Sequence, residues 1–202
     1  MAVTAVVFDV GETLVDETRT WGLVADAVGV PHLTFFAVVG SMIERNERHR
    51  NVFDVLGVEP VQPPPLTEDD FYPDALPCLA ALRAAGYGLG LAANQPVRTA
   101  AFLREAGLEA DFVATSAGWG VEKPAPEFFE RVIEEAGRPA AEIAYVGDRI
   151  DNDVLPAKLA GMLAVFLRRG PWGYIQAQRP QVAEAAIRIE SLTELPEALR
   201  DV

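Results

Sequence analysis

Residues 2–9 read AVTAVVFD, an almost uninterrupted apolar run that is rich in β-branched residues and ends on an aspartate. This composition is typical of a strand that is buried on both faces of a parallel sheet. Similar runs recur along the chain, and stretches with helical spacing of apolar residues separate them. The predicted strands cover residues 2–9, 89–93, 112–115, 143–146, 162–167 and, more weakly, 186–189, and the predicted helices cover 74–85, 97–106 and 127–136.

This alternation of strands and helices determines the expected fold class. Strands that alternate with helices pair in parallel through right-handed crossovers. We therefore predict an α/β fold built on a doubly wound parallel sheet. In such a sheet the ligand site lies at the carboxyl ends of the strands.

The alternation is interrupted once, between residues 16 and 72. This stretch shows no convincing strand and contains three helical patterns, at residues 18–28, 33–45 and 47–56. The run Pro63-Pro64-Pro65 then predicts a stiff, extended return segment. We predict a small α-helical cap domain at residues 16–72, inserted after the first strand of a core domain made of residues 1–15 and 73–202.

Composition and charge exclude several classes of protein. The 202 residues carry 17 basic and 30 acidic side chains, a net charge of −13, which argues against nucleic-acid binding. Cys78 is the single cysteine, so no disulfide can form within the chain. No apolar run approaches the roughly 20 residues of a membrane helix, and the N-terminus lacks a basic leader. We expect a cytoplasmic protein, and its oligomeric state stays open.

Three aspartates follow predicted strands at positions that a parallel sheet would bring together. Asp9 ends the first strand, and Asp148 and Asp153 follow the strand at 143–146. A turn-capping role for Asp9 alone is an alternative. Clustered carboxylates repel one another unless a hard cation lies between them, and oxygen ligands suit Mg²⁺. The three residues therefore predict a magnesium site.

Two further polar residues lie near the same sheet edge. Lys123 precedes a predicted helix; it is either a solvated lysine or a ligand of a phosphoryl oxygen that also offsets the charge of Asp9. Asn94 lies between a strand end and a helix start, which is a natural anion site. The alternative for Asn94 is a helix cap, and both roles can coexist.

Together these residues resemble the motifs of the haloacid dehalogenase-like hydrolase superfamily. Residues 8–14, FDVGETL, resemble its first motif, with Asp9 at the nucleophile and Thr13 at the family threonine. The pair Lys123-Pro124 resembles the third motif, and Gly147-Asp148 with Asn152-Asp153 resembles the fourth. The resemblance covers nearly the whole chain, and the insertion falls where many members carry a cap.

The resemblance implies a Rossmann-like core and a covalent mechanism. Asp9 would attack phosphorus and form an aspartyl-phosphate that water hydrolyses. It implies Mg²⁺ held by Asp9, Asp148 and the backbone carbonyl of Gly11, with Asp153 either as a further ligand or as a holder of waters around the ion. It also implies phosphate binding by Lys123, Asn94 and Thr13, and a small phosphorylated metabolite as the substrate.

Two positions depart from the family pattern. Gly11 stands where phosphatases of the family carry a general acid/base aspartate, a group typically worth 10²–10⁴-fold in rate. Glu12 is the adjacent acid; it is either a substitute or points elsewhere. Ala93 stands where the family has a serine or threonine hydroxyl.

These departures leave three functions open. The chain is a phosphatase with weakened proton transfer, a non-enzymatic scaffold that binds a phosphometabolite or a protein, or a metal-independent 2-haloacid dehalogenase. We favour the phosphatase because the carboxylates and Lys123 are all retained.

The predicted cap contains a locally basic segment, residues 44–50, ERNERHR. It either guides an anionic substrate or forms a solvated helix face with Glu44–Arg48 and Glu47–Arg50 pairs, and we favour the second interpretation. Trp21, Phe35 and Phe36 are expected in the cap core, and Trp172 is expected as an ordinary core residue in a turn at 170–173.

Overall fold

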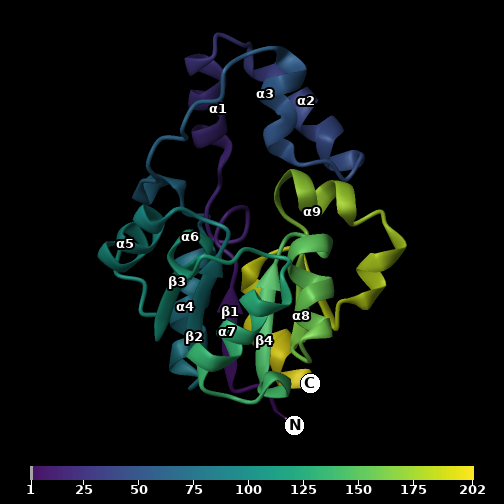
Figure 1. Cartoon of the computed structure of the whole chain (residues 1–202). Coiled ribbons are helices and arrows are strands. Elements are labelled where there is room, and N and C mark those ends of the chain that lie inside the picture. Colours follow the sequence, from purple (N-terminus) through teal and green to yellow (C-terminus); the bar gives the residue numbers. More distant parts are fainter. Residues whose placement is uncertain (1) are drawn as a thin grey trace.

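The computed structural model describes residues 2–202, with the backbone alone at residue 201. Its centre is a six-stranded parallel sheet in the order β3-β2-β1-β4-β5-β6 (Figure 1). The strands are β1 (Ala5–Phe8), β2 (Gly88–Ala93), β3 (Phe112–Thr115), β4 (Ile143–Gly147), β5 (Leu163–Leu167) and β6 (Ile187–Ile189). The predicted doubly wound parallel sheet is confirmed.

Successive residues of β1 point into two different cores, which explains why the whole run is apolar. Val6 and Phe8 pack on one face of the sheet with α4 (Ala75–Ala84), α5 (Val97–Glu105) and α10 (Leu195–Ala198). Ala5 and Val7 pack on the other face with α7 (Pro126–Ala136) and α8 (Leu155–Leu159). All four β1 residues are buried.

Helices α1 (Thr18–Ala27), α2 (His32–Glu44) and α3 (Val52–Leu56) lie between β1 and β2 in the chain and stand above the sheet (Figure 1). The chain leaves and re-enters the core side by side, because Val15 and Phe71 form an antiparallel bridge. The predicted helices at 18–28 and 33–45 are confirmed, and Phe35 and Trp21 pack in the cap core as expected. The cap boundaries at residues 16 and 72 stay a prediction.

The predicted helix at 47–56 is wrong in its first half. Helix α2 ends before Asn46, which has a left-handed φ of 58°, and Arg48 is extended. A 3₁₀ turn, η1 (His49–Asn51), then leads into α3. The break removes the helical spacing that the expected Glu–Arg pairs require. No such pair occurs among the ion pairs of the described residues.

The predicted turn at 170–173 is instead the start of helix α9 (Gly170–Gln176). Gly170 has a φ of 61°, and Pro171 occupies the first turn, where a missing N–H costs nothing. Trp172 is buried as expected, but it packs in the cap core with Phe35 and Val39. Helix α9 thereby connects the core to the cap (Figure 1).

The remaining elements are short. They are α6 (Ser116–Trp119), the π-helical turn η4 (Ile150–Val154), and the 3₁₀ turns η2 (Glu68–Asp70), η3 (Ala140–Glu142), η5 (Pro180–Glu184), η6 (Leu192–Glu194) and η7 (Leu199–Asp201). Within residues 2–202, no single helix has both the length and the apolar composition needed to cross a membrane; the pair α1 and α2, bent by 114°, passes that test only when taken together.

Candidate active site

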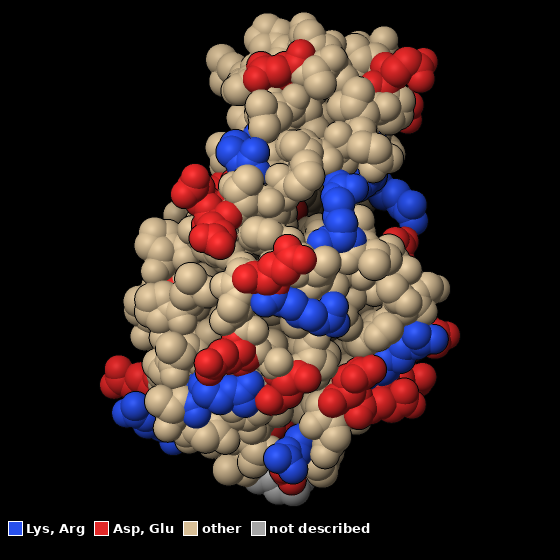
Figure 2. Space-filling view, turned by 90° about the vertical axis from the view of Figure 1, so that its left-hand side faces the viewer, with Lys and Arg blue, Asp and Glu red and all other residues tan. Residues whose placement is uncertain are grey.

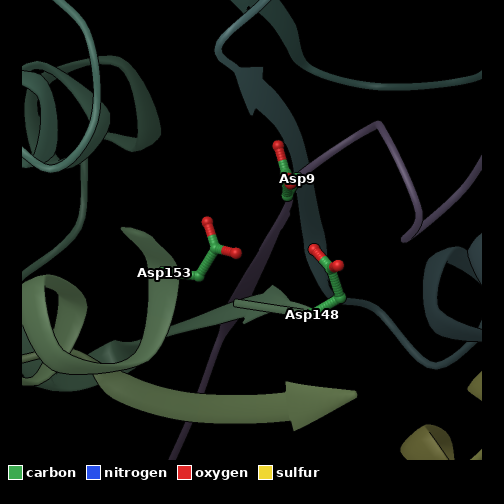
Figure 3. Close-up of side chains that lie close together, drawn as sticks. All are labelled: Asp9, Asp148 and Asp153. Atoms are coloured by element: carbon green, nitrogen blue, oxygen red, sulfur yellow. The ribbon is translucent and has the colours of Figure 1, made fainter. Parts of the chain in front are cut away.

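Three carboxylates meet at the carboxyl edge of the sheet (Figure 3). Asp9 follows β1, Asp148 follows β4, and Asp153 lies in η4. One oxygen from each lies within 4.8 Å of an oxygen of the other two, and all three residues are buried. The expected convergence of these side chains is therefore present, because β1 and β4 are neighbours in register, with Phe8 opposite Val146.

Local backbone structure orients Asp153 towards this cluster. Its Oδ2 accepts a hydrogen bond from the backbone N–H of Arg149 at 3.0 Å. A Cβ atom at Gly147 would lie 2.3 Å from Asp153 Cγ. Only glycine at position 147 therefore lets the strand end approach the Asp153 carboxylate this closely.

Lys123 is buried in the cluster and is not a solvated lysine. Its Nζ lies 2.7 Å from Asp9 Oδ1 and 2.5 Å from Asp153 Oδ1. Burial alone would lower the pKa of Lys123, but the Asp153 and Asp9 carboxylates outweigh it and raise that pKa well above its usual value. Lys123 is therefore a fixed positive charge beside the Asp9 carboxylate.

The charges of the cluster do not balance without a further cation. Three carboxylates face one ammonium group, and Asp148 Oδ2 is buried with no hydrogen-bond partner. Burial raises the pKa of Asp148 well above its usual value, and the nearby charges of Asp153 and Asp9 raise it further. An unpartnered buried carboxylate oxygen beside two others is a donor set that fits Mg²⁺. Gly11, the remaining expected ligand, lines the same cavity.

The two other predicted phosphate ligands occupy different surroundings. The Asn94 side chain pairs with the backbone of Lys123, donating from Nδ2 to its carbonyl at 2.9 Å and accepting its N–H at 2.8 Å. Asn94 thus holds the Lys123 loop and also lines the cavity. Thr13 is fully buried, its Oγ1 lacks a hydrogen-bond partner, and it does not contribute to the described cavity lining. Phosphate binding by both residues stays a prediction.

A cavity of about 900 Å³ separates the three carboxylates from the cap. Asp9 and Lys123 line it from the core, and Trp21, Arg48 and Arg50 line it from the cap. Figure 2 shows basic and acidic side chains intermixed around the waist between cap and core. The basic segment thus borders the cavity, although Arg48 itself remains highly exposed.

Two glutamates in the loop after β1 also line the cavity. Glu12 Oε2 accepts a hydrogen bond from the Tyr72 hydroxyl at 2.7 Å, and burial raises the pKa of Glu12 to about 7. Glu17 was not singled out by the sequence, yet it is packed against Gly11, and burial raises its pKa. No local pattern marks Glu17, because its position depends on the fold of the whole loop.

Comparison with known proteins places this site in a family. A family model described as haloacid dehalogenase-like hydrolase matches residues 3–161. The chain is similar to the glyceraldehyde 3-phosphate phosphatase of Methanopyrus kandleri, with 38% identity over 104 residues, 50% of this chain and 45% of the relative. It is also similar to the phosphoserine phosphatase of Thermus thermophilus, with 37% identity over 135 residues, 63% of this chain and 51% of the relative.

Among solved structures, the crystal structure of a HAD phosphatase from Thermococcus onnurineus matches with a TM-score of 0.65 and 26% identity, covering 98% of each chain. The chain spans about half the length of the curated relatives it matches. The family model nevertheless covers most of the chain, including Asp9, Lys123, Asp148 and Asp153. The chain belongs to the haloacid dehalogenase-like hydrolase family.

Proposed function

We propose that the chain is a Mg²⁺-dependent phosphatase that acts on a small phosphorylated metabolite through an aspartyl-phosphate at Asp9. The observation that carries the proposal is the position of Asp9. Its carboxylate ends a central strand, lies 2.7 Å from the Lys123 ammonium, and belongs to a cluster of three carboxylates within 4.8 Å.

The reaction assigns a distinct role to each residue. An Asp9 oxygen attacks phosphorus while the bond to the leaving oxygen breaks, and water later releases phosphate from Asp9. Lys123 offsets negative charge on the transferring group. Asp9, Asp148, Asp153 and the Gly11 carbonyl would hold the ion. When bound, Mg²⁺ supplies further positive charge to the phosphoryl oxygens.

The size of the cavity and the relatives support a small substrate. A cap above a cavity of about 900 Å³ suits a metabolite better than a phosphorylated protein surface. The relatives that the chain resembles are named for glyceraldehyde 3-phosphate and phosphoserine, both small phosphate esters.

The charge of the cluster distinguishes the proposal from its alternatives. A metal-independent 2-haloacid dehalogenase would leave the buried, unpartnered Asp148 Oδ2 without a role. A phosphometabolite-binding scaffold would not need a buried nucleophile that contacts a lysine. Halide release from a 2-haloacid in the presence of chelator would favour the dehalogenase.

The direct test compares the wild-type protein with Asp9→Asn on a panel of phosphate esters, with and without Mg²⁺. We expect hydrolysis by the wild type only with Mg²⁺ and none by Asp9→Asn, because an amide cannot act as the nucleophile. Glu44→Gln, at the exposed end of α2, is the matched control and should retain wild-type activity. A wild-type protein that is inert on all esters would favour the scaffold.

A further inference from the structure

The space beside Gly11 is already filled by a carboxylate from elsewhere in the chain. A Cβ atom at position 11 would lie 2.8 Å from Glu17 Oε1, 2.9 Å from Glu17 Cδ and 3.2 Å from Glu17 Oε2. A side chain at position 11 therefore has no room unless Glu17 moves. The Glu17 carboxylate therefore lies directly beside the place where a side chain at position 11 would begin.

The loop after β1 folds back so that Glu17 reaches this place. Gly11 and Val15 form a bridge, and Glu12 has a left-handed φ of 53° between them. The Glu17 N–H donates to Glu12 Oε1 at 3.1 Å, which fixes the backbone just before α1. Glu12 thus contributes to the position of Glu17.

Two neutral donors orient the Glu17 carboxylate. Gln95 Nε2 donates to Oε1 at 3.1 Å, and Trp21 Nε1 donates to Oε2 at 3.3 Å. These donors come from opposite sides of the cavity, since Gln95 follows β2 and Trp21 belongs to α1. Neither donor is cationic, so the carboxyl group is held in place without an ion-pair partner in these contacts.

The other acidic groups of the cavity are placed differently. Glu12 is held by the Tyr72 hydroxyl and by the backbone of Glu17. Asp151 pairs with Arg149. Glu47 is exposed, and Glu122 is largely exposed near Arg48. Glu17 is the acidic residue that supplies the three atoms closest to the vacant side-chain position at Gly11.

We propose that Glu17 is the general acid/base of this site and takes the role that the side chain at position 11 cannot perform; this inference rests on the proposed function. As Asp9 bonds to phosphorus and the bond to the leaving oxygen breaks, the Glu17 proton passes to that oxygen. Glu17 then takes a proton from the water whose oxygen bonds to phosphorus as the bond to Asp9 breaks. The products are the alcohol and phosphate, and both carboxyl groups return to their starting state.

The test compares an activated ester, p-nitrophenyl phosphate, with an alkyl ester, glycerol phosphate, in the Mg²⁺-containing enzyme. Glu17→Gln keeps the shape of the side chain but cannot exchange the proton, and its single amide oxygen can accept only one of the hydrogen bonds from Gln95 and Trp21. We expect kcat/KM on glycerol phosphate to fall about 10²–10⁴-fold and kcat/KM on p-nitrophenyl phosphate to change much less, because nitrophenolate leaves without a proton.

The same variant should also show a burst. With p-nitrophenyl phosphate, Glu17→Gln should release one nitrophenolate per protein rapidly and then turn over slowly, with phosphorylated Asp9 detectable by mass spectrometry of the intact protein. Loss of a residue with only a structural role would not make this intermediate accumulate. Glu44→Gln serves as the control, and thermal unfolding checks that each variant is folded.

The second variant relocates the carboxylate by a double substitution. Gly11→Asp combined with Glu17→Gly moves the acid from position 17 to position 11 and should restore part of the kcat/KM on glycerol phosphate. Equal losses on both esters, or wild-type kinetics of Glu17→Gln, would overturn the role of Glu17 while the phosphatase stands. A wild-type protein that hydrolyses neither ester would instead overturn the proposed function.

Discussion

Lys123 Nζ contacts one oxygen of Asp9 and one of Asp153, and these contacts provide the compensating positive charge within the buried cluster. Removal of one partner from a buried ion pair leaves an uncompensated charge and costs about 3–5 kcal/mol. We expect Lys123→Met to lower the free energy of unfolding by this amount in metal-free protein. Urea denaturation in chelator measures it, with Glu44→Gln as the control. A loss below about 1 kcal/mol would show that Lys123 does not stabilise the cluster.

Individual site residues differed in how far the sequence could predict them. Asp9, Asp148 and Asp153 each follow a buried strand or its adjoining turn, so topology alone brings them together. Glu17 carries no such marker. Its position depends on the left-handed Glu12 and on hydrogen bonds to Gln95 and Trp21, which no local pattern encodes.

At the level of the elements, η1 and α9 meet at the contact between cap and core, where α2 also packs on α9. The His49 ring of η1 lies edge-on between Trp21, at 5.3 Å between ring centroids, and Trp172 of α9, at 5.1 Å. Burial, together with the positive charges of Arg149 and Arg50, lowers the pKa of His49 from 6.5 to about 4. His49 is therefore neutral at pH 7 in the folded protein.

The sign of the resulting pH dependence follows from this depressed pKa. The unfolded chain takes up a proton on His49 near pH 6.5, whereas the folded chain does so only near pH 4. The stability that a neutral His49 contributes is therefore complete above pH 6.5 and is lost as the pH falls to about 4. The shift corresponds to at most about 3 kcal/mol. We expect His49→Phe to lose less stability than the wild type between pH 7 and pH 4.5, as measured by urea denaturation. Parallel losses in the two proteins would contradict this.

The same two elements show where sequence patterns fail. The strands were predictable because each is a short apolar run buried on both faces, as in Ala5–Phe8. The helix expected at 47–56 is interrupted by the left-handed Asn46 and the extended Arg48. Gly170 and Pro171 also favour turns, so the sequence predicts a turn where helix α9 begins, and the burial of Trp172 in the cap core distinguishes the two.

On the scale of the whole molecule, the sheet order sets the position of the carboxylate cluster, and the cap stands above it (Figure 1). Residues of the cap and of the core line the cavity between them. The neighbouring strands β1 and β4 deliver Asp9 and Asp148 to one edge, and η4 adds Asp153. A parallel sheet makes this convergence predictable from sequence. The depth of the cavity and the contact between cap and core are not, because they depend on packing between segments far apart in the chain.

The central claim is that the carboxylates of Asp9, Asp148 and Asp153 together hold one divalent cation. Isothermal titration of Mg²⁺ into the wild-type protein, Asp148→Asn and Glu44→Gln tests it most directly. Asp148→Asn removes a buried, unpartnered charge, so it should remain folded in chelator. We expect one Mg²⁺ to bind per chain in the wild type and Glu44→Gln and none in Asp148→Asn. Absence of binding to the wild type, or equal binding to all three proteins, would contradict the claim.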